Sequence, residues 1–153
     1  MWKKAKVKVK VESQPRSLSV KLKPKPKPKP VIPPMYATFE DMPVWHKAMN
    51  LAEQVFALTE PLPRKEDYGL TSQIRRSALS VPGNIAEGFG RQHTKDKLNF
   101  YYIARGSLAE TKSHLIYGSK VGYFQQSEVI ALSQLIENIW QELNKLINSF
   151  TQP

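Results

Sequence analysis

The sequence predicts an all-α protein, an up-down antiparallel four-helix bundle with a disordered Lys/Pro-rich N-terminal tail. Three observations lead to this prediction. Residues 35–153 contain four segments in which apolar residues recur every three or four positions, the spacing of one helix face. Proline, glycine or polar residues separate these segments. Residues 1–34 differ sharply in composition, so we expect a tail over 1–34 and a bundle over 35–153.

The excess positive charge lies entirely in the tail. The chain carries 23 Lys and Arg against 13 acidic residues, a net charge of +10. Residues 1–34 hold eleven of these cations and one acid, Glu12, whereas the remaining twelve cations and twelve acids of residues 35–153 balance. An argument from net charge to nucleic acid is therefore an argument about the tail.

Lysine and proline alternate from Lys23 to Pro30. Each proline fixes φ and removes a hydrogen-bond donor, and the like charges repel, so we expect an extended, solvated, polyproline-type chain. Such a chain can contact phosphates without reading bases, although a solvated extension with no partner is the alternative. The candidate contacts in the repeat are Lys23, Lys25, Lys27 and Lys29.

Composition excludes several classes of protein. The chain has no Cys, which excludes disulfides, thiolate metal sites and a cysteine nucleophile. No apolar run reaches the length of a membrane span, and no apolar segment follows the basic N-terminus as in a secretory signal. We therefore expect a cytoplasmic protein with no membrane contact.

The first helix is expected to begin near Asp41 as N-cap, with Pro43 in its first turn, and to end before Pro61 and Pro63. Its predicted apolar face consists of Trp45, Ala48, Met49, Ala52, Val55 and Phe56.

The second helix is expected from about Leu70 to Gly88, with Gly88 and Gly90 ending it. Pro82 lies in its interior and cannot donate to the carbonyl of Ala78, which predicts a kink. Its predicted apolar face consists of Leu70, Ile74, Ala78, Val81 and Ile85.

The third helix is expected from Thr94 to about Gly118 and has two opposed apolar faces. One face consists of Phe100, Ala104, Ser107, Leu108, Thr111 and Leu115. The other consists of Leu98, Tyr102, Ala109 and Ile116. Because a helix in a monomeric bundle needs only one apolar face, the second face predicts subunit contacts.

The fourth helix is expected to begin at Ser127 as N-cap. A bundle helix is the favoured interpretation of its apolar repeat, and a long coiled coil is the alternative. The repeat consists of Val129, Leu132, Ile136, Ile139, Leu143, Leu146 and Phe150, flanked by Leu135, Trp140 and Ile147.

Three segments in order, FEDMPVWHKAMNLA, YGLTSQIRRSALSVPGNIAEGFGR and FYYIARGSLAE, resemble the four helix bundle protein family over about Phe39 to Phe150. Members are also called 23S ribosomal RNA intervening sequence proteins and are related to the accessory variability determinant proteins of diversity-generating retroelements. The resemblance implies an up-down bundle, commonly a homopentameric ring, with no known enzymatic activity. It also implies relatives encoded inside ribosomal RNA insertions, and retroelement relatives that bind nucleic acid and a reverse transcriptase.

Two groups of polar residues are candidate sites. The first group is interpreted as a structural network in which a buried Glu87 or Glu110 pairs with Arg75, Arg76 or Arg105, with a nucleic-acid contact or catalysis as alternatives. It consists of Ser80, Asn84, Glu87, Arg105 and Glu110. The second group could form a phosphate-binding surface when repeated around a ring, although a solvated, salt-bridged face is the alternative. It consists of Arg75, Arg76, Arg91, Lys95 and Lys97.

No catalytic, metal or cofactor site is predicted. A di-iron bundle needs Glu-x-x-His on two helices, and this spacing does not occur. Gly88 to Arg91 follows a helix and lacks the Gly-Lys-Ser/Thr ending of a phosphate loop, so it is interpreted as a helix terminator. We expect a non-enzymatic homo-oligomer, preferably a pentamer, that binds RNA or DNA or serves a nucleic-acid enzyme as an adaptor. A protein–protein scaffold with no nucleic-acid role is the alternative.

Overall fold

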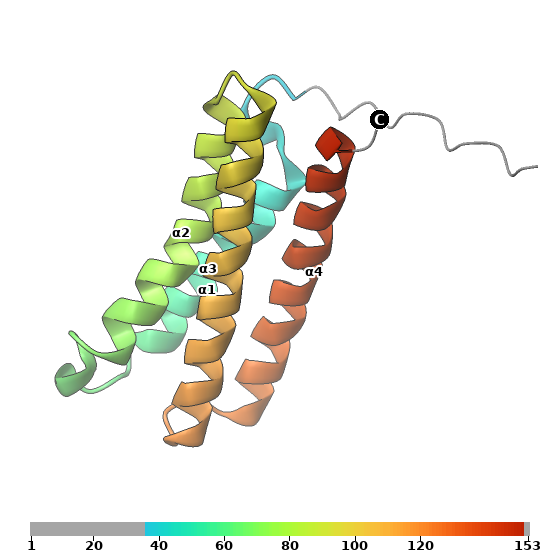
Figure 1. Ribbon diagram of the computed structural model, residues 1–153. Coiled ribbons are helices and arrows are strands. Elements are labelled where there is room, and N and C mark those ends of the chain that lie inside the picture. Colours follow the sequence, from blue (N-terminus) through green and yellow to red (C-terminus); the bar gives the residue numbers. More distant parts are fainter. Residues whose placement is uncertain (1–35, 152–153) are drawn as a thin grey trace, which may run out of the picture.

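The computed structural model describes residues 36–151, and the tail predicted over 1–34 lies outside these residues. Four long helices form the described part: α1 (Pro43–Thr59), α2 (Leu70–Gly90), α3 (Thr94–Lys120) and α4 (Gln126–Thr151). Short 3₁₀ helices at Phe39–Asp41 and Arg64–Glu66 precede α1 and α2. The prediction of an all-α four-helix bundle is confirmed (Figure 1).

The helices run alternately up and down, and each packs against two others (Figure 1). Successive helices are neighbours, and α4 closes the bundle by packing against α1. The closest pair is the α2–α3 hairpin, whose two helices are joined by residues 91–93 alone. The start of the described chain, the α2–α3 connection and the end of α4 lie at one end of the bundle.

The core follows the predicted periodicity on three of the four helices. All five predicted positions of α2 are buried. On α3 the predicted inner face is buried from Ala104 to Leu115, while Phe100 is only partly buried and Tyr101 replaces it as the buried ring. Burial raises the pKa of the Tyr101 hydroxyl to about 12. On α4 the repeat is buried from Val129 to Leu143, and Ile147 is buried instead of Leu146.

The predicted face of α1 is wrong in phase. Val44, Leu51 and Thr59 are buried with Ala48 and Val55. The sequence offers two overlapping apolar stripes on this helix, and the aliphatic one faces the core because it fits between α2 and α4. The larger rings lie at the edges, where Trp45 packs edge-on against Phe39 and Phe56 is exposed under Arg75.

Two predicted helix starts are also wrong. Pro43 is the first residue of α1 and Met42 precedes it, while the Asp41 carboxylate accepts a 2.9 Å hydrogen bond from the Thr38 backbone N–H. Helix α4 begins at Gln126, one residue before Ser127, and the Glu128 side chain accepts the Gln125 N–H at 2.8 Å. The Asp41 carboxylate thus stabilises the preceding 3₁₀ turn instead of capping α1, and Glu128 rather than Ser127 satisfies a backbone N–H at the start of α4. Helix α2 continues through the buried Pro82 to Gly90 without interruption.

Small hydroxyl side chains line the contact between α2 and α3. The Ser77 and Thr111 oxygens lie 3.0 Å apart, as do those of Ser80 and Ser107. The Ser77, Ser107 and Thr111 hydroxyls also donate to carbonyls of their own helices, and the Ser80 hydroxyl accepts from the Asn84 amide, so none of the four is left without a partner. Because they are short, they permit the close approach of the two backbones.

The α3–α4 turn is closed by an aromatic ring resting on a glycine. Gly122 has φ 83°, a left-handed conformation that favours glycine. The N–H groups of Tyr123 and Phe124 both donate to the Gly118 carbonyl, at 2.8 and 3.3 Å. The buried Phe124 ring occupies the space that a side chain at position 118 would need.

Candidate nucleic-acid interface

The structure does not bring the five predicted basic residues together as one surface. Arg75 and Arg76 lie in the first half of α2, whereas Arg91, Lys95 and Lys97 surround the α2–α3 connection. Arg91 follows Arg75 by sixteen positions, which corresponds to about 24 Å along a helix. The basic residues of one chain therefore form two separate groups.

In the first group, Arg75 is bound within the bundle. Its guanidinium lies 4.2 Å from the centre of the Phe56 ring, and its Nε donates to the Thr59 hydroxyl at 2.6 Å. It also pairs with Glu60 at 2.9 Å. These contacts join α1 to α2 and leave little of the guanidinium free for a ligand. Arg76, in contrast, is 75% exposed and lies 4.0 Å from Glu110.

In the second group, Lys97 caps the end of α2. Its amine donates to the carbonyls of Phe89 at 2.6 Å and Gly88 at 3.4 Å, where helical carbonyls lack partners. Arg91 pairs with Glu87 and lies 4.6 Å above the Phe100 ring. Lys95 is exposed and forms no ion pair with the part of the chain that the structure describes.

The five polar residues predicted as one network separate into four local arrangements. Asn84 donates to the Ser80 hydroxyl at 2.9 Å within the α2–α3 contact. Glu87 is 48% exposed and pairs with Arg91, four residues later. Because an exposed pair contributes at most about 1 kcal/mol, the interpretation of Glu87 as a buried structural charge is wrong. Glu110 contacts Arg76, as one of the predicted pairings, and lies 3.5 Å from His114 Nε2.

Arg105 forms an arrangement that the sequence did not indicate. Its guanidinium lies 4.8 Å from the Trp140 ring centre and 5.4 Å from the Tyr102 ring centre. One Nη donates to the Asn144 side-chain oxygen at 2.8 Å, and the buried Nε has no acceptor. We call Arg105, Tyr102, Trp140 and Asn144 the Arg105 cluster. Trp140 and Asn144 are far from Arg105 in sequence. Tyr102, three positions before Arg105, was the one local signal of the cluster in the sequence.

Three cations contact aromatic rings in the half of the bundle near the α2–α3 connection. Arg91 with Phe100, Lys97 with Phe89, and Arg105 with Tyr102 and Trp140 all belong to this half. The described part of the chain starts at the same end of the bundle (Figure 1).

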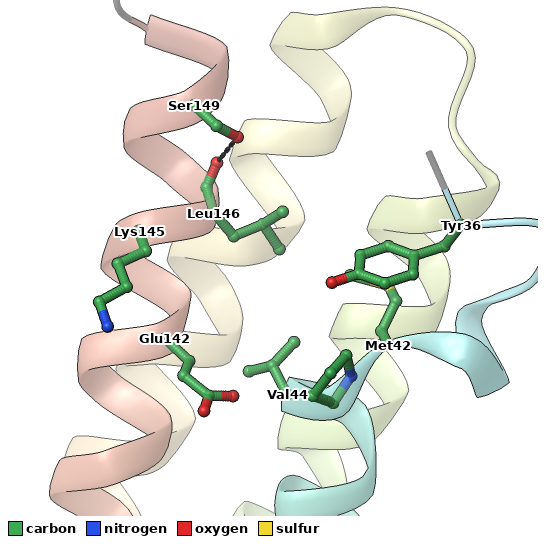
Figure 2. Close-up of a pocket in the computed structure, with 8 residues that line it drawn as sticks. Tyr36, Met42, Val44, Glu142, Lys145, Leu146 and Ser149 are labelled. Carbon is green, nitrogen blue, oxygen red and sulfur yellow. Dashed lines mark hydrogen bonds between the residues drawn. The ribbon is translucent and has the colours of Figure 1, made fainter. Parts of the chain in front are cut away.

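A mostly apolar pocket of about 320 Å³ opens between the start of α1 and the end of α4 (Figure 2). Tyr36, Met42 and Val44 face Leu146 across it, and Glu142, which pairs with Lys47, lies at its edge. The Ser149 hydroxyl donates to the Leu146 carbonyl at 2.6 Å and not to a side chain that could act as a general base. Within residues 36–151 no group of three His, Cys, Asp or Glu side chains is placed to hold a metal ion.

The sequence matches the family of 23S rRNA-intervening sequence proteins over residues 40–145. The chain belongs to this family. The match includes α1 to α3, α4 as far as residue 145 and the Arg105 cluster, whereas residues 1–39 and 146–153 lie outside it. No curated protein matches the sequence.

The fold of this family member is shared with a solved structure. A protein of unknown function from the S23 ribosomal protein family of Bacteroides thetaiotaomicron has a TM-score of 0.62 and 21% sequence identity to it. The alignment covers 68% of this chain and 97% of that chain. No described helix of this family member is both long and apolar enough to cross a membrane.

Proposed function

We propose that this family member is a non-enzymatic, oligomeric four-helix bundle that binds nucleic acid, preferably structured RNA, or serves a nucleic-acid enzyme as an adaptor. The observation that carries the proposal is that Arg91, Lys97 and Arg105 each contact an aromatic ring in the half of the bundle where the described chain starts. Eleven Lys and Arg lie in residues 1–34, which come directly before this end of the bundle in the sequence. Positive charge beside aromatic rings suits phosphates and unpaired bases. The family's description, which names 23S rRNA, supports RNA as the nucleic acid.

The double variant Arg91→Gln, Lys95→Gln tests the contribution of the bundle. We expect lower affinity for a structured RNA, and a slope of log affinity against log salt that is smaller by about one for each lost phosphate contact. Arg64→Gln with Lys120→Gln is the matched control, because it removes two exposed cations at the opposite end of the bundle. Equal losses in both double variants would contradict a localised interface.

The proposed homo-oligomer follows from two exposed apolar surfaces. On α3, the predicted second face is exposed at Tyr102, Ala109 and Ile116 and partly buried at Leu98. Ala109, Ser113, Ile116 and Tyr117 form what we call the α3 outer surface, with Tyr117 54% exposed. Across the bundle, Leu79 is 60% exposed beside Phe56 in a hollow of about 290 Å³ between α1 and α2.

These two surfaces differ and lie on different sides of one chain, so each can contact the other in the next copy. Such head-to-tail contacts form a ring when the rotation from one copy to the next closes. Five subunits remain the preferred number because of the resemblance noted above. The same surfaces favour the alternative of a protein–protein scaffold with no nucleic-acid role.

Ala109→Glu is expected to dissociate the oligomer while the helices remain. A charge at the centre of an apolar contact is costly to bury, whereas the position is exposed in the single chain. Light scattering would report the mass, and circular dichroism the helix content. Gln141→Glu, which adds a similar charge on the exposed side of α4, should leave the mass unchanged. A monomer mass for the unmodified chain at micromolar concentration would contradict the proposed oligomer.

A further inference from the structure

Arg105 differs from the paired arginines of the bundle in having no acidic partner. Arg75, Arg76 and Arg91 each lie within 4.0 Å of a glutamate oxygen. Among residues 36–151 no carboxylate pairs with Arg105, whose one hydrogen-bond partner is the neutral Asn144 side chain. A partly buried cation without a counter-anion is costly unless other contacts compensate for the lost water.

The two aromatic rings supply part of that compensation. Trp140 and Tyr102 lie within cation–π distance of the guanidinium, at 4.8 and 5.4 Å, and Asn144 limits its orientation. The buried Nε–H still has no acceptor. The Arg105 cluster therefore holds a planar fork of donors in a defined position and lacks the oxyanion that such a fork binds best.

The surroundings favour a nucleotide over other oxyanions. Tyr102 is 47% exposed and also lines a shallow hollow of about 410 Å³ with Lys95, Leu98 and Asn99. Asp96 also lines this hollow beside Lys95, and no acidic residue occurs on α3 from Leu98 to Ala109. An aromatic ring for stacking, an amide for the base edge and an arginine for the phosphate are the groups that bind unpaired nucleotides.

We propose that the Arg105 cluster is a nucleotide subsite for a single-stranded segment of RNA or DNA, with the phosphate at Arg105 and the base against Tyr102. This inference rests on the proposed nucleic-acid function and specifies which part of the nucleic acid the bundle binds. A paired base is stacked on its neighbours and does not present its face to Tyr102, so the subsite selects single strands. Lys95 lines the same hollow as Tyr102, so its amine would contact an adjoining phosphate.

Asn144→Asp is the sharpest test. A carboxylate at this position would lie at the Asn144 oxygen, 2.8 Å from the Arg105 Nη, and would provide the missing anion from within the chain. We expect unchanged or higher thermal stability together with about a tenfold loss of affinity for a single-stranded oligonucleotide. Arg105→Gln should give a similar loss by removing the cation. Lys145→Gln, which removes one charge from the adjoining residue on the pocket side of α4, is the matched control and should bind normally.

The fluorescence of Trp140 provides a second measurement, because it reports binding at the Arg105 cluster itself, whereas affinity does not locate the site. The chain has three tryptophans, and Trp2→Phe with Trp45→Phe leaves Trp140 as the sole tryptophan. Its emission should change on addition of the single strand, with the same midpoint as binding, and should not change with the same sequence as a duplex. A variant that also carries Asn144→Asp should lose this response.

The outcomes separate this inference from the proposed function. Normal single-strand affinity in both Asn144→Asp and Arg105→Gln, or a Trp140 response equal for duplex and single strand, would overturn the subsite. If structured RNA still bound in that case, the proposed function would stand without it. If both variants instead changed the oligomeric mass while oligonucleotide binding stayed normal, the cluster would hold a carboxylate of a second copy and the inference would be wrong.

Discussion

Deleting residues 1–34 is expected to lower the affinity for any RNA or DNA by a similar factor and to flatten the dependence of log affinity on log salt. This segment carries eleven cations and one acid, whereas residues 35–153 are balanced. If about six of these cations neutralise phosphates, the deletion should reduce the steepness of the slope by about 4 to 5. The full chain should then lose about 10³ more affinity than the shortened chain when salt rises from low to moderate concentration. The measurement is a salt titration of the full and shortened chains against two unrelated nucleic acids.

A chain of full length with fewer charges is the control for this deletion. Replacing Lys23, Lys25, Lys27 and Lys29 by Gln keeps the length and the prolines, so a purely electrostatic contribution predicts an intermediate slope. The shortened chain should retain any preference among sequences or shapes, because the side chains proposed to contact bases lie in the bundle. Identical slopes for the full and shortened chains would exclude residues 1–34 as an anchor. No binding by either at low salt would favour the protein–protein scaffold.

Phe124→Ala is expected to destabilise the bundle by about 3–5 kcal/mol, because its buried ring fills the α3–α4 turn. Gly118→Ala should cost about 1–3 kcal/mol, since its new methyl group collides with that ring. Denaturant unfolding followed by circular dichroism would give both values. Introduced together, the two substitutions should cost less than the sum of their separate effects, because the collision disappears with the ring.

Gly83→Ala is the matched control for the glycine. Position 83 is also helical, but nothing lies within 4 Å of a side chain there, so alanine should be neutral or stabilise by up to about 1 kcal/mol. Equal effects at positions 83 and 118 would show that backbone propensity, rather than contact with Phe124, decides the cost.

Periodicity was sufficient to predict the fold, because burial on α2, α3 and α4 repeats at the helical spacing. It was insufficient for α1, where two apolar stripes overlap and only the shape of the neighbouring helices decides which is buried. The bounds of α1 and α4 shifted because Asp41 and Glu128 bind nearby backbone N–H groups.

The candidate site was predictable in its residue types but not in its arrangement. The roles of Arg75 and Lys97 depend on where α1 and α2 end, since both side chains donate to groups near those ends. Arg105 was expected to pair with an acid, but its partners come from α4, and Trp140 was predicted only as a flank of the apolar repeat. Pairings between helices far apart in sequence are set by packing, which periodicity does not specify.

The hydroxyl contacts of the α2–α3 hairpin also bear on the order in which the chain folds. Residues 91–93 form a short loop, so closing this hairpin costs less entropy than bringing α1 to α4. Ser77 with Thr111 and Ser80 with Ser107 then fix the register of the two helices before a complete core exists. We therefore expect this hairpin to form the folding nucleus, with α1 and α4 docking on it late and separating from it first on unfolding.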